Sequence, residues 1–71
     1  MLNRVAAAAL ATALGAFAQV EELARHRNLG KAFFENPTTG RLAVEEFRKA
    51  LALSGADRDR LNLGMALIKD G

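Results

Sequence analysis

A short motif recurs in this chain after an interval of 34 residues. Residues 28–34 read NLGKAFF and residues 62–68 read NLGMALI, so four positions are identical and two more stay large and apolar. A period of this length corresponds to a two-helix unit, because one helical hairpin cannot bury its apolar face without a stacked neighbour. The recurrence therefore predicts a helical repeat.

Composition limits what can be built around that repeat. The chain has 71 residues, 51% of them hydrophobic, and no cysteine, so it provides one small domain without disulfides. The β-branched residues are scattered and give no strand signal. We expect an all-α, antiparallel arrangement. The formal charge is only +2, with basic residues interleaved among acidic ones, which does not indicate a nucleic-acid partner.

The repeated residues also follow a family pattern. His26, Leu29, Gly30 and Phe33 are spaced as in the first helix of a tetratricopeptide repeat, and Ala43, Phe47 and Ala50 as in its second helix. The chain resembles this family, although Gly55 replaces the closing proline. The resemblance implies an α-solenoid of about one and a half repeats. The first repeat covers about residues 23–56, and the first helix of the second covers about 57–70 and contains Leu63 and Gly64.

The small residues of the pattern have a physical role in a helical hairpin. Gly30 and Ala32 on the first helix, with Ala43 and Ala50 on the second, are expected to let the two axes approach closely. The remaining space is expected to be filled by Leu29, Phe33 and Phe47. Each large side chain contributes about 1.5 to 3 kcal/mol when fully buried, so we expect Phe33→Ala and Phe47→Ala to be the most damaging changes.

Local signals divide the chain into three helices. The first is expected over residues 20–35, ending before Pro37, and Thr38 or Thr39 is expected to cap the second. Residues 54–57 predict a break and a third helix that runs through Ile68. The apolar stripe of the second helix comprises Leu42, Ala43, Phe47, Ala50 and Leu51.

The first eighteen residues resemble a secretory signal peptide. Arg4 precedes an uncharged run over residues 5–17, and Ala16-Phe17-Ala18 before Gln19 has the form that signal peptidase accepts. The run is shorter than the ~20 apolar residues that a membrane span needs. Cleavage would leave residues 19–71 as a periplasmic or secreted protein. The alternative is an alanine-rich N-terminal helix of a cytoplasmic protein.

Few residues in the chain are suited to catalysis or to metal binding. His26 is the only histidine, and the acid pairs at residues 21–22 and 45–46 point about 100° apart on a helix. Ser54 has no base beside it in a recognised arrangement. The sequence therefore predicts neither an enzyme nor a metal site, and neither a cofactor nor a small-molecule substrate.

What remains is a binding surface. In the tetratricopeptide family the first helix of each repeat lines a concave groove, and the resemblance carries this role to two sets of residues. They are Arg27, Lys31 and Phe34, then Leu61, Met65 and Ile68. The predicted function is a scaffold, part of a longer exported repeat protein, that holds a peptide or protein segment in this groove. Alternatives are burial of the second set by a further helix, self-association through the unpaired third helix, and a membrane-associated peptide that keeps its N-terminal helix.

Overall fold

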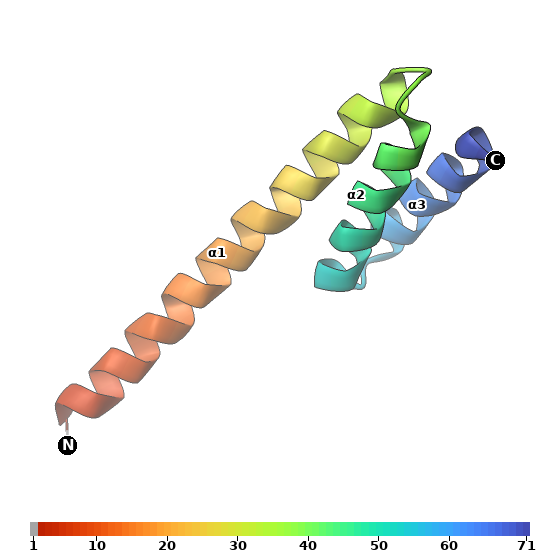
Figure 1. The fold of residues 1–71 in the computed structure, drawn as a ribbon. Coiled ribbons are helices and arrows are strands. Elements are labelled where there is room, and N and C mark those ends of the chain that lie inside the picture. The colour runs from red at the N-terminus through yellow and green to blue at the C-terminus, as the bar shows by residue number, and fades with distance from the viewer. Residues whose placement is uncertain (1) are drawn as a thin grey trace.

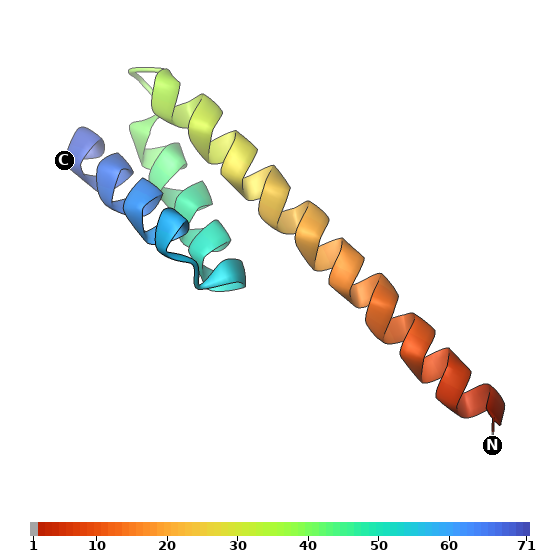
Figure 2. The ribbon, with the colours of Figure 1, turned by 180° about the vertical axis from the view of Figure 1, so that it is seen from behind.

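The chain folds into three helices joined by short turns. The computed structural model describes the backbone of residues 2–71 and the side chains of residues 14–71. The helices are α1 (Leu2–Glu35), α2 (Gly40–Ser54) and α3 (Asp57–Asp70). Helix α2 packs between α1 and α3, and consecutive helices run in opposite directions (Figures 1 and 2). The described part of the chain contains no strand, so the all-α prediction is confirmed.

Helix α1 is longer than the sequence analysis predicted. It begins at Leu2 and not at Val20, because the alanine-rich stretch before Val20 has high helix propensity and continues the same helix. This N-terminal half projects away from α2 and α3 (Figure 1), and residues 14–20 are all exposed. Met1 and the side chains of residues 2–13, on which much of the export prediction depends, lie outside the described part.

The turn from α1 to α2 is held by side chains that bond backward. Asn36 Oδ1 accepts hydrogen bonds from the Thr38 amide and hydroxyl, both at 2.9 Å. Thr39 occupies the position before α2, but its hydroxyl donates to the Phe33 carbonyl at 2.7 Å and makes no capping bond to α2. Thr39 is therefore the N-cap residue of α2, as predicted, but its side chain bonds to the end of α1 and does not cap α2.

The turn from α2 to α3 lies at the predicted break. Gly55 has φ of 62°, in the left-handed region that favours glycine, and its amide donates to the Leu51 carbonyl at 2.8 Å. Asp57 and Asp59 then stand in the first turn of α3, where negative charge is favourable.

The core is centred on α2. It consists of Ala43, Val44, Phe47 and Ala66, with Phe33, Phe34 and Leu63 packed against it, and Ala50 is also fully buried. The expected close approach occurs at Gly30: a Cβ there would lie 2.5 Å from Cε1 of Phe47. Helix α2 is covered on two sides, by α1 and by α3.

Two core assignments from the sequence are therefore corrected. Ala32 is exposed, because two helical steps of about 100° turn it to the far side of α1 from Gly30. Leu42 is exposed, and Val44, which the sequence analysis overlooked, is buried in its place. The other predicted small positions, Gly30, Ala43 and Ala50, are buried.

Candidate binding groove

A concavity of about 300 Å³ lies between α1 and α3, with Phe47 of α2 at its base. We call it the α1–α3 groove. Helices α1 and α3 line it with residues of the same spacing, four and then three positions apart, which places each set on one helix face. The lining residues are Arg27, Asn28, Lys31 and Phe34 of α1, Phe47, and Arg58, Asn62 and Met65 of α3.

The structure brings four of the six predicted groove residues together. Arg27, Lys31, Phe34 and Met65 all line the α1–α3 groove. Leu61 and Ile68 lie outside it, with 65% and 84% of their surfaces exposed. The face that α3 presents to the groove carries Arg58 and Asn62, since α3 packs against α2 through Asp59 and Ala66.

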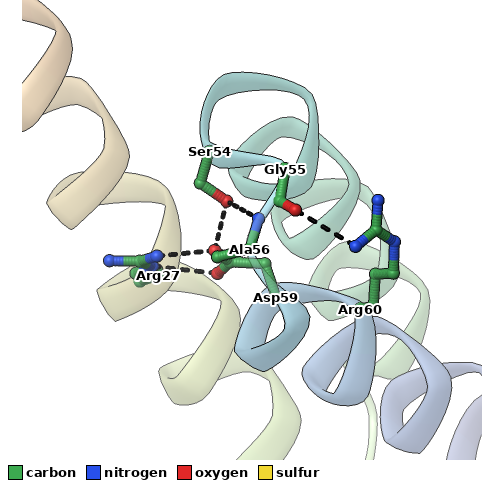
Figure 3. A network of polar contacts seen from close by, with 6 residues as sticks. All are labelled: Arg27, Ser54, Gly55, Ala56, Asp59 and Arg60. Carbon is green, nitrogen blue, oxygen red and sulfur yellow. Dashed lines mark hydrogen bonds and ion pairs between the residues drawn. The ribbon is translucent and has the colours of Figure 1, made fainter.

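Arg27 is engaged across the wall of the groove and is not a free cation. Its Nε donates to Asp59 Oδ1 at 2.8 Å and its Nη2 to Asp59 Oδ2 at 2.6 Å. The Ser54 hydroxyl also donates to Asp59, and it accepts a hydrogen bond from the Ala56 amide at 3.0 Å. Figure 3 shows this network joining α1, the second turn and α3.

The charge of Asp59 is well compensated although its side chain is fully buried. The hydrogen bond from Arg27, opposed by burial and assisted by Ser54, lowers the pKa of Asp59 to about 2. The same hydrogen bond raises the pKa of Arg27. Both groups are ionised near neutral pH, and the pair fixes α3 relative to α1.

His26 makes a second polar contact, between α1 and α2. It is buried, and its Nδ1 donates to Glu46 Oε2 at 2.5 Å, while its Nε2 lies 3.7 Å from Glu22 Oε1. Burial raises the pKa of Glu46, but the hydrogen bond from His26 and the charge of Lys49 outweigh it, so that the pKa is lowered overall. The position at which the predicted repeat pattern has a bulky residue is thus filled by a histidine whose ring nitrogens face two carboxylates.

Lys69 of α3 contacts Phe34, one of the residues that line the groove. Its Nζ lies 4.3 Å from the centroid of the Phe34 ring and also donates to the Phe34 carbonyl, so it joins the ends of α1 and α3. Neither Lys69 nor Asp59 was predicted from the sequence. The sequence offered one signal for Asp59: it is an acidic residue on the side of its helix that becomes buried, and a basic residue, Arg27, lies opposite it.

The groove suits an anionic group beside apolar side chains. Among the described residues, each charged side chain that lines it is basic, and Lys31 and Arg58 are exposed. Asn28 and Asn62 add amide groups, and Phe34, Phe47 and Met65 add apolar surface. No set of three histidine, cysteine or acidic side chains gathers as a metal site in the part of the chain that the structure describes.

Comparison with known proteins identifies no relative. No protein-family model, no curated protein and no solved structure matches this chain. Within the described residues, none of the helices has the length and apolar character needed to cross a membrane.

Proposed function

We propose that this chain is a protein-interaction module of the tetratricopeptide type, and that its α1–α3 groove binds a peptide segment with an acidic group next to apolar side chains. The observation that carries the proposal is the lining of the groove. It combines the exposed cations Lys31 and Arg58 with an apolar base at Phe47. Such a surface attracts a carboxylate and gives its apolar neighbours a place to pack.

The repeat assignment is supported by packing at the motif positions. Phe47 lies directly over Gly30, and Ala43 and Ala50 are fully buried at the interfaces of α2. The second copy of the motif supplies Leu63, which packs against the core. These are the contacts that a two-helix repeat with a close interaxial approach requires.

The size of the groove sets the scale of the interaction. A volume of about 300 Å³ is at the small end of ligand sites and accommodates a few side chains of a peptide. Because Arg27 is held by Asp59, the specificity for an anion depends on Lys31 and Arg58. We expect micromolar affinity that weakens as salt screens the two exposed cations.

Fluorescence anisotropy of short labelled peptides tests this function. An eight-residue peptide of alternating glutamate and leucine should bind the full chain, and the same peptide with lysine in place of glutamate should not. Lys31→Glu with Arg58→Glu should weaken binding at least tenfold, by reversal of both charges. Arg48→Glu is the matched control, because Arg48 is exposed on α2 and does not line the groove. Equal binding of both peptides, or equal loss in the control, would exclude the groove.

Membrane association through α1 is a second candidate. Leu14, Phe17 and Val20 are exposed on the part of α1 that projects from the helical body. An exposed apolar segment of a helix can lie in a membrane interface. Co-sedimentation with phosphatidylcholine vesicles distinguishes the two functions: Phe17→Asp should abolish it without altering peptide binding. Absence of any vesicle binding would remove this candidate.

A further inference from the structure

The two glycines of the repeated motif have opposite surroundings. Gly30 of α1 is covered by the Phe47 ring, whose Cε1 and Cδ1 would lie 2.5 and 2.6 Å from an added Cβ. Gly64 of α3 occupies the same place in the motif, yet a Cβ built there meets no described atom within 4 Å beyond its chain neighbours and the backbone of its own helix. The space beside Gly30 is thus filled by an aromatic ring, whereas the space beside Gly64 is open.

The difference arises from how each helix packs against α2. Helix α1 uses the face that contains His26 and Gly30, whereas α3 uses the face that contains Asp59 and Ala66. The face of α3 that corresponds to the α2-binding face of α1 is therefore left uncovered. We call it the Gly64 face. On a helix its residues fall within an arc of about 120°: Arg60, Leu61, Gly64, Leu67 and Ile68.

The Gly64 face is apolar around the glycine. Leu61, Leu67 and Ile68 surround Gly64, with 65%, 43% and 84% of their surfaces exposed. A glycine between large aliphatic side chains leaves a notch that admits a ring, as Gly30 admits that of Phe47. By this similarity, an aromatic ring is the kind of group that fits over Gly64.

We propose that the Gly64 face binds an amphipathic helix of a partner protein that resembles α2, with the pattern Ala-x-x-Glu-Phe-x-x-Ala. In α2 this pattern is Ala43, Glu46, Phe47 and Ala50. The partner's phenylalanine enters the notch over Gly64, and its alanines allow the close approach that Ala43 and Ala50 allow within the chain.

Charge complementarity supports the same occupant. Arg60 stands in the motif where His26 stands in α1, and His26 binds Glu46, the residue before Phe47. A glutamate before the partner's phenylalanine therefore lies opposite Arg60. Among the described residues Arg60 contacts Gly55 O at 3.1 Å and Asp57 Oδ1 at 3.0 Å, both through Nη1. Since Asp57 is exposed, Arg60 can leave it for the glutamate of the partner protein at little cost in free energy.

The Gly64 face is separate from the α1–α3 groove. In Figure 3 Arg60 extends from the opposite side of α3 to the side that meets Arg27. Gly64 and Asn62, which lines the groove, lie about 160° apart around the helix. The inference therefore goes beyond the proposed function, and variants can disable either surface alone.

The test uses a fluorescein-labelled peptide with the sequence of residues 40–54, titrated with the full chain. We expect saturable binding. Gly64→Leu in the chain should fill the notch and weaken binding at least tenfold, and Phe47→Ala in the peptide should do the same. Gly15→Leu is the matched control: it is also a helical glycine with open space at Cβ, but it lies on the projecting part of α1. Circular dichroism of both variants checks that they stay folded.

A charge exchange tests the register of the complex. Arg60→Glu in the chain should weaken binding, and Glu46→Arg in the peptide should restore it. The proposal is overturned if Gly64→Leu leaves binding unchanged, which would mean that the peptide displaces α2 from Gly30. It is also overturned if sedimentation shows that the chain forms a dimer, that Gly64→Leu dissociates this dimer, and that the dimer does not bind the peptide. In that case the Gly64 face binds a second copy of the chain. Lys31→Glu with Arg58→Glu should leave this peptide bound, which separates the result from that of the groove.

Discussion

Asp59 and Arg27 lie 32 positions apart in the chain, yet both carboxylate oxygens of the buried aspartate accept hydrogen bonds from the guanidinium. The contact joins α1 to α3 at one wall of the α1–α3 groove. Because α1 and α3 each pack mainly on α2, this pair sets the distance between the two helices that line the groove.

Asp59→Asn tests how much stability this pair contributes. The amide keeps the size of the side chain but cannot accept both guanidinium bonds, and Arg27 loses its counter-ion in a partly buried place. We expect the free energy of unfolding to fall by about 3 kcal/mol. Urea denaturation followed by circular dichroism measures the loss. Asp57→Asn, at an exposed acid in the same turn, should have little effect.

Stability should depend on pH in the acid range. The pKa of Asp59 is about 2 in the folded chain, below its ordinary value, and the pKa of Glu46 is also lowered. Groups with a lowered folded pKa contribute their full stability above their unfolded pKa and lose it as pH falls through the folded one. We therefore expect constant stability above about pH 5 and a progressive loss toward pH 2, to which Asp59 contributes about 2 kcal/mol. Urea melts at several pH values should show this slope, and Asp59→Asn should reduce it. A slope unchanged in that variant would contradict the assignment.

Gly30→Ala and Gly64→Ala should have opposite effects on the free energy of unfolding. Alanine in a helix is favoured over glycine by about 1 kcal/mol, and Gly64 has open space for the methyl group, so Gly64→Ala should stabilise the chain by up to that amount. At Gly30 the methyl group would meet the Phe47 ring, and we expect a net loss of about 1 to 2 kcal/mol. Thermal melts of the two variants measure this difference. Adding Phe47→Leu to Gly30→Ala should recover part of the lost stability, because the smaller side chain makes room for the methyl group.

Local signals predicted the three-helix fold well. Pro37 and the segment of residues 54–57 are local signals, and they led to the end of α1, the second turn and the start of α3. The start of α1 was missed because an alanine-rich stretch is typical both of a stable helix and of an export signal. The sequence pattern alone does not distinguish these two possibilities.

The groove was predicted at three positions on the α1 side but only at Met65 on the α3 side, for a geometric reason. The family pattern gave Leu61 and Ile68 the role on α3 that Arg27 and Phe34 have on α1, as if both helices presented the same face to the groove. In the structure Asp59 is buried against Arg27, and this turns Arg58 and Asn62 toward the groove instead. A bond between residues 32 positions apart is a tertiary contact, and no local periodicity encodes it.

Phe47→Ala should be more damaging than Phe33→Ala, although the sequence analysis treated them alike. Phe47 is buried between all three helices, over Gly30 and at the base of the groove, whereas Phe33 is half-buried at the end of α1. We expect a loss of at least about 3 kcal/mol for Phe47→Ala and about half of that for Phe33→Ala. Chemical denaturation of the two variants, with Phe17→Ala as the exposed control, measures the order. If Phe33→Ala proved the more costly change, the hydrophobic core would have to be centred on the first turn and not on α2.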